Sequence, residues 1–180
     1  GRPAFSIIDI ASWSVKSTMA LDHAWYGLAW SPDGKRLYSA GAGQNNVQQF
    51  NYADGLITRA RTFALPAVTG ESFVGGLTVS PDGRTVFATR VFAQSLSSID
   101  VATGQTTKTV TLPAEPYSCL VPADGQRLYV SLWGGSRVPV YATPSLLQLD
   151  EYAPSGHPHA RVLSPDGNPL LDASRHAASV

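Results

Sequence analysis

Two histidines one residue apart, His157 and His159, are the side chains whose types and spacing most directly suggest chemistry in this 180-residue chain. In an extended strand, positions i and i+2 lie on the same side, so such a pair presents two imidazoles together. A catalytic zinc ion is held by three protein ligands and lowers the pKa of its bound water to about 7. The pair therefore predicts a divalent metal site, with zinc as the expected metal, that activates water for hydrolysis.

The histidine pair stands just before a turn sequence that recurs along the chain. Ser-Pro-Asp-Gly, or a close variant of it, occurs four times at intervals of 42 to 49 residues. In this turn the proline sets φ at the second position, the aspartate can bond to nearby backbone, and the glycine accepts a positive φ. A period in the low forties is the length of one four-stranded propeller blade. The turn aspartates are Asp33, Asp82, Asp124 and Asp166.

The repeats predict an all-β fold: a β-propeller fragment of four-stranded antiparallel blades, with residues 1–180 forming a single partial propeller domain. The chain begins with the outer two strands of a blade and finishes with material that matches only the inner two. We therefore expect three complete blades and two half blades, which would make one composite blade if joined. Unpaired strand edges attract other strands, which favours completion of the ring by oligomerisation; closure within one chain is the alternative.

The last repeat departs from the others. Pro169 stands where the other copies have arginine or threonine, and Asp172 lies inside the expected strand. A proline at this position removes a donor from the strand ladder. We therefore expect residues 168–180 to form an irregular or disordered tail.

Counting back along the sequence from each turn aspartate identifies equivalent positions in the repeats. In a propeller, the segment seven to ten residues before each turn aspartate is the loop that leads into the innermost strand. Its side chains are therefore expected to gather around the central channel at one face. The residues at these positions include His23, Tyr26, Gly75, Glu115, Tyr117, His157 and His159.

We expect His157 and His159 to ligate the metal, with Glu115, His23 or the same histidines of a neighbouring chain completing the ligand set. The structural alternative is that the two histidines are polar residues lining a hydrated channel. On that alternative, His23 is a surface residue and Glu115 a solvated loop carboxylate.

Three further residues are candidates for stabilising negative charge in a reaction. Arg161 occupies an innermost-strand position that is apolar in the other repeats, and a cation there needs a carboxylate partner or an anionic ligand. Tyr26 and Tyr117 could donate hydrogen bonds at the same channel face. The alternative for the tyrosines is packing between blades.

Composition excludes several classes of function. The 13 acidic and 13 basic residues cancel and are scattered, so we expect neither nucleic acid nor an anionic membrane as a partner. The chain has no apolar run of about 20 residues and no signal-peptide pattern, so we expect a soluble protein. The single cysteine, Cys119, excludes an internal disulfide and is expected to be a core thiol.

Three strand segments carry a family resemblance. "RLYVS" (127–131), "RLYSA" (36–40) and "TVFAT" (85–89) resemble the name-giving motif of the YVTN-repeat, lactonase-like β-propeller family. The resemblance implies a propeller of usually seven or eight blades and a bacterial periplasmic or extracellular location. Some such propellers are joined to a phosphoesterase domain, whose metal and nucleophile motifs are absent from this chain.

The residues and the resemblance together predict a metal-dependent hydrolase of esters, lactones or phosphoesters and phosphotriesters. Its small-molecule substrate would bind at the channel face beside the histidine-ligated metal. The alternative is a non-catalytic propeller that serves as a binding or scaffold module for a small ligand or a protein partner.

Overall fold

The computed structural model describes residues 3–154, 157–164 and 170–175; for residues 157, 159–163 and 170–175 it describes the backbone alone. The regular elements are strands and a short 3-10 helix, η1 (Trp133–Gly135). The strands, in chain order, are β1 (Ala4–Asp9), β2 (Ser14–Ala20), β3 (Leu28–Trp30), β4 (Arg36–Ala40), β5 (Asn46–Ala53), β6 (Leu56–Ala64), β7 (Val74–Val79), β8 (Thr85–Arg90), β9 (Ser95–Asp100), β10 (Thr106–Thr111), β11 (Pro116–Leu120), β12 (Arg127–Leu132), β13 (Val138–Ala142), β14 (Gln148–Tyr152), β15 (His157–Leu163) and β16 (Leu170–Arg175).

The strands form three four-stranded antiparallel sheets and two two-stranded sheets. Blade 1 is β3–β6, blade 2 is β7–β10 and blade 3 is β11–β14, each with consecutive strands paired. The N-terminal half blade is β1–β2 and the C-terminal half blade is β15–β16. This arrangement confirms the predicted all-β propeller fragment of three complete blades and two half blades.

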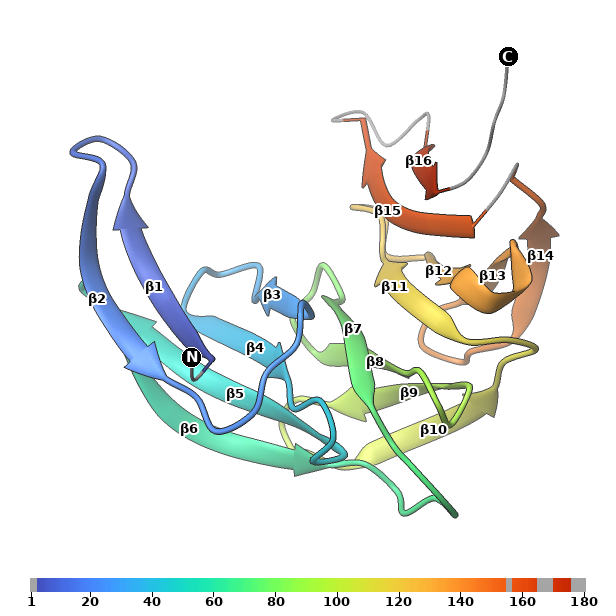
Figure 1. The fold of residues 1–180 in the computed structure, drawn as a ribbon, viewed down its shortest axis with the longest axis horizontal. Helices are drawn as coiled ribbons and strands as arrows, with labels where there is room; N and C mark the ends of the chain where they lie inside the picture. Colours follow the sequence, from blue (N-terminus) through green and yellow to red (C-terminus); the bar gives the residue numbers. More distant parts are fainter. Residues whose placement is uncertain (1–2, 155–156, 165–169, 176–180) are drawn as a thin grey trace.

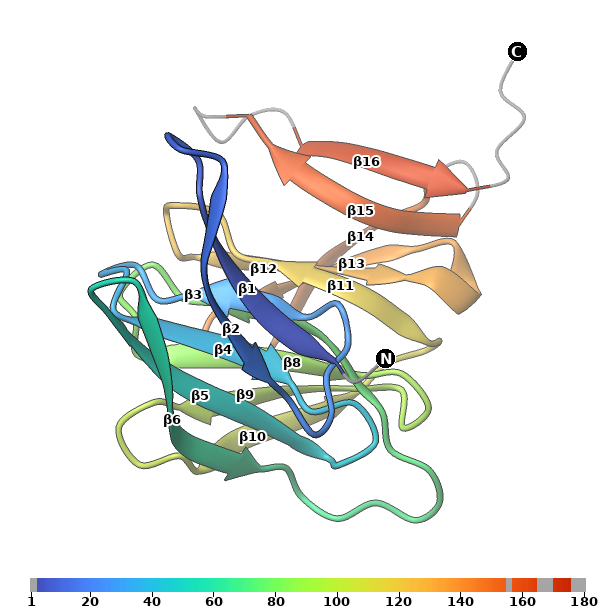
Figure 2. The same ribbon diagram turned by 60° about the vertical axis from the view of Figure 1, so that its left-hand side comes forward.

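The sheets follow an open arc, with β1–β2 at one end and β15–β16 at the other (Figure 1). The two half blades remain separate sheets, so within one chain they do not form the composite blade. The view turned by 60° shows β15–β16 next to blade 3 and β1–β2 next to blade 1 (Figure 2). Completion of the ring by oligomerisation therefore stays a prediction.

The C-terminal tail corrects one expectation. Residues 168–180 were expected to be irregular, but Leu170–Arg175 forms β16 and pairs with β15. The strand begins one residue after Pro169, where a missing backbone donor does not interrupt the ladder. Residues 165–169 and 176–180, which include Asp166 and Pro169, lie outside the described residues.

The repeated turns have the structural role that the sequence predicts. Asp33 and Asp82 each accept hydrogen bonds from a serine hydroxyl two residues earlier and from a backbone N–H two residues later. Asp124 accepts the equivalent backbone N–H from Gln126 at 3.0 Å. Glycines with φ near +70° follow these three aspartates. The turn aspartates thus close the hairpins and are accounted for without a role in chemistry.

These turns predict a pH dependence of stability. The serine hydroxyl and then the backbone N–H hold the pKa values of Asp33 and Asp82 below the ordinary value, because both donors favour the charged carboxylate. A lowered folded-state pKa contributes stability above the unfolded pKa, and that stability is lost as pH falls through the folded pKa. We expect thermal unfolding to show declining stability below about pH 4.

The matched variant is Asp33→Ala with Asp82→Ala. Its melting temperature, followed by circular dichroism from about pH 7 to pH 3, is expected to fall less steeply at the acidic end than that of the unmodified chain. Some dependence remains, because a hydrogen bond from Lys16 lowers the pKa of Asp9 and one from the Thr103 N–H lowers that of Asp100. An identical acidic slope in both proteins would show that the turns do not contribute.

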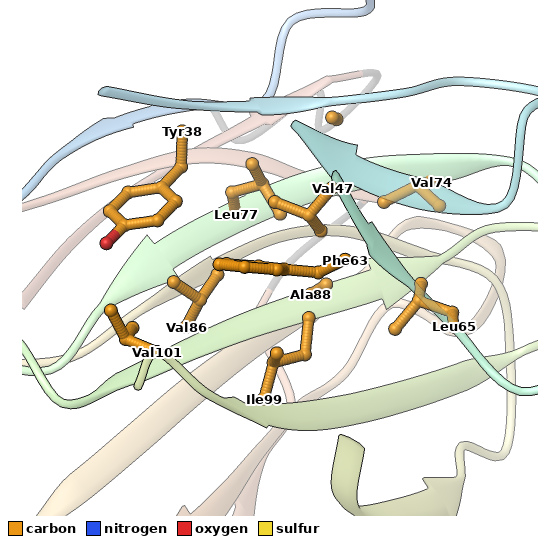
Figure 3. Close-up of a cluster of buried hydrophobic side chains, with 11 residues drawn as sticks. Tyr38, Val47, Phe63, Leu65, Val74, Leu77, Val86, Ala88, Ile99 and Val101 are labelled. Carbon is orange, nitrogen blue, oxygen red and sulfur yellow. The ribbon is translucent and has the colours of Figure 1, made fainter. Parts of the chain in front are cut away.

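Apolar side chains between neighbouring blades form the core. Figure 3 shows the cluster between blades 1 and 2, with Phe63 of β6 in its middle. A second cluster joins blades 2 and 3, and a third joins the N-terminal half blade to blade 1. Cys119 is buried in the second cluster, as predicted. Burial of these faces fixes each blade against the next and so sets the arc. In the described ranges, no helix has the length and apolarity needed to cross a bilayer.

Candidate functional site

The loops that lead into the inner strands lie at one face of the arc, which we call the channel face. The β4–β5, β8–β9 and β12–β13 turns lie at the same face, because antiparallel pairing places the start of each inner strand beside the end of the second strand of its blade. His23, Tyr26 and Glu115 all lie in these loops, as the sequence predicts. Tyr117 follows in β11.

The inner strands of blades 2 and 3 begin with an irregular register. The pairing of β7 with β8 shifts across Gly75–Gly76, and that of β11 with β12 shifts across Tyr117–Ser118. At each irregularity a buried side-chain hydroxyl accepts a hydrogen bond from the backbone. Thr89 Oγ1 accepts from the Gly76 N–H at 3.0 Å, and Ser131 Oγ accepts from the Ser118 N–H at 2.8 Å. Such bulges redirect side chains, and at these positions they lie at the channel face.

Two candidate residues from different blades meet directly at this face. The rings of Tyr26 and Tyr117 stack, with centroids 4.4 Å apart and planes 12° from parallel. Gly75 occupies the equivalent position in the blade between them, and a Cβ there would lie 3.2 Å from the Tyr26 hydroxyl. The missing side chain of Gly75 therefore makes room for the stack.

The neighbouring inner strands also approach each other closely. A Cβ on Gly27 would lie 2.1 Å from the Gly75 carbonyl oxygen, and one on Gly76 would lie 2.8 Å from the Tyr117 carbonyl oxygen. Real Cβ atoms do not approach backbone atoms at such distances, so both positions require glycine. The close approach brings Tyr26 and Tyr117 within stacking distance across blade 2.

The environment of Tyr26 keeps its hydroxyl protonated. Burial raises the pKa of Tyr26 above its ordinary value, and the neighbouring Cys119 and Tyr117 groups raise it further. A phenol of raised pKa donates a hydrogen bond at neutral pH and does not act as a base. This property suits the predicted role of stabilising negative charge.

The tyrosine stack continues into a larger aromatic cluster. Trp25 packs edge-on against Tyr26 and Phe73, with centroids 6.2 and 5.2 Å apart, and Phe73 packs against Phe92 at 5.8 Å. Trp25 is 54% exposed and Phe92 is 57% exposed. We call Trp25, Tyr26, Phe73, Phe92 and Tyr117 the aromatic rim. Exposed apolar surface of this kind marks binding sites.

A buried arginine lies close to the rim and was not singled out from the sequence. Arg90, at the end of β8, is 2% exposed. Its guanidinium donates to Ser95 Oγ at 2.9 Å, to the Pro66 carbonyl at 2.8 Å and to Asn45 Oδ1 at 3.5 Å. Burial lowers the pKa of Arg90. Within the described residues, no ion pair includes it.

The sequence held information that could have identified Arg90. The equivalent positions of the other complete blades are Gly41 and Leu132, so a charge at this point is as unusual as Arg161 is in its own strand. In the structure, Arg90 holds the loop before β7 through Pro66. It also contacts Asn45, which accepts a second hydrogen bond from Ser72 Oγ at 2.6 Å.

His23 and Glu115, the predicted metal ligands whose side chains are described, do not belong to a group of possible metal ligands. His23 is exposed, and its carbonyl accepts from Gln48 Nε2 at 3.0 Å. Glu115 is half-buried, and its Oε1 accepts from Gln94 Nε2 at 2.9 Å. Among the residues whose side chains are described, no three His, Cys, Asp or Glu are grouped so that they could hold a metal ion.

For His157 and His159 the structure describes the backbone alone. Residues 157–163 form β15, so His157 and His159 lie in the inner strand itself and not in the loop before it, where the sequence placed them. The pairing of β15 with β16 has a register irregularity between Pro158 and Ala160, so the two-residue alternation is not regular at His159. Arg161 is paired with Asp172 in the register. The side chains of His157, His159 and Arg161 lie outside the described residues, and their roles stay predictions.

An open hollow also lies away from the channel face. It is an open groove of about 950 Å³ between β6 and the turns of blade 2 at the opposite face. Arg59 and Arg61 line it, but their guanidiniums already donate to backbone carbonyls at the end of β2 and in the β9–β10 turn. The aromatic rim is therefore a better candidate for a ligand site than this groove.

Comparison with known proteins points to one family. Residues 12–134 match the SMP-30/gluconolactonase/LRE-like region family. No curated protein matches the chain.

Two solved structures share the fold. Hydrazine synthase of Kuenenia stuttgartiensis superposes with a TM-score of 0.75 at 21% identity, over 86% of this chain and 43% of that one. A putative 6-phosphogluconolactonase from Bacteroides uniformis superposes with a TM-score of 0.78 at 16% identity, over 96% and 57%. The chain thus spans about half the length of these structures.

Proposed function

Because the chain belongs to the SMP-30/gluconolactonase/LRE-like family, we propose that it is a hydrolase of lactones and related esters that acts at the channel face. The observation that carries the proposal is the aromatic rim, where rings from three successive blades contact one another and Trp25, Tyr26 and Phe92 are exposed. Small-molecule sites are mostly apolar surfaces with a few placed polar groups. A ring-shaped lactone fits this description.

The protonated hydroxyl of Tyr26 supplies one placed polar group. When water attacks a lactone carbonyl, negative charge develops on the carbonyl oxygen before the ring C–O bond breaks and the hydroxy acid forms. A hydrogen-bond donor aimed at that oxygen stabilises the transition state more than the ground state. We assign this role to Tyr26, with Tyr117 stacked against it. The positive charge of Arg161 is assigned to attract the negative charge that develops on the carbonyl oxygen.

His157 and His159, with Glu115 or His23, are assigned to hold a divalent metal, expected to be zinc. Glu115 fits this assignment because Gln94 already bonds one of its oxygens, as outer hydrogen bonds do for carboxylate ligands. A divalent metal held there would supply a bound water of lowered pKa.

The test is an assay of the purified chain with a sugar lactone, a simple δ-lactone and an aryl ester, together with measurement of its bound metal. We expect hydrolysis above the buffer rate that is lost on treatment with a chelator and restored by zinc. Saturable binding of the lactone without hydrolysis would overturn the proposal in favour of a non-catalytic binding module.

The aromatic rim makes a separate prediction about KM. Trp25→Ala removes stacking area that contacts the substrate equally before and during the reaction, so KM is expected to rise about five- to tenfold with kcat changed less than about twofold. Trp30→Ala is the matched control, because Trp30 is also exposed but lies at the far end of β3. Equal effects of the two substitutions would contradict a binding role for the rim.

A further inference from the structure

A polar groove lies between blades 1 and 2, at the face opposite the aromatic rim. It has a volume of about 950 Å³. One wall is formed by β4, β5 and β6 of blade 1, and the other by the β7–β8 and β9–β10 turns of blade 2. Backbone carbonyls engage only part of its arginines, and the rest of the lining suits a ligand unlike the lactone proposed for the aromatic rim.

Three arginines of the groove are candidates to bind an anion. Within the described residues, no ion pair includes Arg36, Arg61 or Arg84. Arg61 extends to the β9–β10 turn, where its Nη1 donates to the Val101 and Ala102 carbonyls at 3.1 and 3.0 Å. These bonds fix the guanidinium in the groove and use only one of its nitrogens, so the others can donate to a ligand.

The other charged groups of the groove are already engaged. Asp82 and Asp100 each accept two hydrogen bonds from their own turns. Arg59 donates to Asp22 at 3.3 Å, and that carboxylate balances its charge. Among the remaining lining residues, three positive charges stand against two negative ones. The groove therefore has a net positive charge, which attracts anions.

Two buried polar groups lie beside these arginines. Gln49 is 6% exposed and lines the groove, and the fully buried Tyr38 is paired with it across β4–β5. Among the described residues, neither Gln49 Oε1 nor the Tyr38 hydroxyl has a hydrogen-bond partner of good geometry. Burial raises the pKa of Tyr38, and the nearby guanidiniums of Arg36 and Arg61 oppose the rise. Figure 3 shows this hydroxyl at the end of the cluster where Val101 lies, which also lines the groove. A buried polar atom without a partner is costly, so a ligand that bonds to it gains affinity.

The junction of blades 2 and 3 shows that the repeat itself does not require these groups. There, the residues equivalent to Arg36, Tyr38, Gln49, Arg61 and Arg84 are Thr85, Phe87, Ser98, Lys108 and Gln126, in that order. One of the three cations is kept. Phe87 has no hydroxyl, and Ser98 Oγ shares a hydrogen bond with Thr107 Oγ1 at 2.8 Å. The arginines and the unpartnered polar groups thus occur together at the junction of blades 1 and 2, as expected for parts of one site.

We propose that this groove binds a small oxyanion that carries a hydroxyl group. Arg36, Arg61 and Arg84 donate to its phosphate or carboxylate oxygens, because a guanidinium matches the geometry of both anions. The ligand hydroxyl donates to Gln49 Oε1 and gives that buried acceptor a partner. The Tyr38 hydroxyl is assigned to donate to the same anion. The groove lies away from the aromatic rim, so the proposal does not depend on the hydrolase activity.

Isothermal titration calorimetry of the purified chain tests the site. Glycerol phosphate and glycerate carry the two kinds of anion on similar hydroxylated carbons, and glycerol is the neutral control. We expect at least one of the anions to bind saturably at one site per chain, more weakly as the salt concentration rises, and glycerol not to bind. The anion that binds more tightly identifies the class of ligand. Absence of saturable binding by both anions would overturn the proposal.

Arginine variants locate the bound anion. Arg36→Ala and Arg84→Ala are each expected to weaken binding at least about tenfold, because each removes a charged donor. Arg84 is an exposed turn residue, so its variant is expected to keep the melting temperature of the unmodified chain. Arg127→Ala is the matched control, since Arg127 is the blade 3 equivalent of Arg36 and lies outside the groove. Equal losses in Arg36→Ala and Arg127→Ala would overturn the proposal.

A variant of Gln49 tests the contact with the ligand hydroxyl. The unmodified chain is expected to bind the hydroxylated anions about fivefold more tightly than propyl phosphate and propionate, which lack the hydroxyls. Gln49→Leu removes the acceptor at similar volume and is expected to abolish this preference while the chain still binds the anions. Circular dichroism checks that the variant is folded. A preference that persists in the folded variant would overturn the proposal.

Discussion

Replacing His157 or His159 with alanine is expected to lower kcat/KM for lactone hydrolysis by at least about 100-fold. Loss of groups that merely orient metal ligands costs about 10- to 100-fold in metal affinity or activity, and loss of a ligand itself costs more. The same variants are expected to lose most of their bound zinc, which distinguishes ligation from a role in substrate binding. Initial rates and metal content measured on the same preparation check both expectations.

The third ligand can be identified by the same measurements. If Glu115 completes the ligand set, Glu115→Ala loses metal and His23→Ala keeps it; if His23 does so, the pattern reverses. His176→Ala, in the C-terminal tail and outside the predicted ligand set, is the histidine control and is expected to keep its rate within about twofold. Alanine variants of the pair that retain both metal and rate would show that these histidines only line the channel.

Replacing Arg90 with alanine is expected to lower the free energy of unfolding by about 3 kcal/mol. The side chain is 2% exposed, and it donates to Ser95, Pro66 and Asn45. Hydrogen bonds from a charged donor contribute about 1.5–3 kcal/mol each and truncation leaves a cavity, but removing Arg90 also removes the cost of burying its charge, which offsets part of that sum. For a chain of this size the loss corresponds to a fall of roughly 6–12 °C in melting temperature.

Arg90→Met separates the contribution of the charge from that of the volume. Methionine fills much of the same space without burying a charge, and Asn45 Nδ2 still donates to the Pro66 carbonyl at 3.2 Å. The loss is therefore expected to be about half that of Arg90→Ala. Thermal and urea unfolding of both variants check this order. Equal losses would mean that the guanidinium hydrogen bonds, and not the filled volume, dominate.

The structure bears on the channel-face prediction only through the positions of Tyr26 and Tyr117, and the roles of the candidate site residues stay predictions. Counting from the turn aspartates correctly placed Tyr26 and Tyr117 at one face, because repeat-equivalent positions occupy equivalent places in every blade. It did not predict that the two rings stack, since that contact depends on the missing side chain of Gly75 in the blade between them. It also missed Arg90, whose partners include Asn45 of the β4–β5 turn and Pro66 of the segment between blades 1 and 2.

The sequence alone was sufficient to predict the blades and their turns, because the proline, aspartate and glycine of each turn act on backbone angles within four residues. It was also sufficient to predict the two half blades, because strand periodicity is local. Only the tertiary structure determined the register shifts at Gly75–Gly76 and Tyr117–Ser118, the tyrosine stack and the polar groove between blades 1 and 2. Those features depend on which surfaces meet between blades, and such contacts are set by packing over the whole arc.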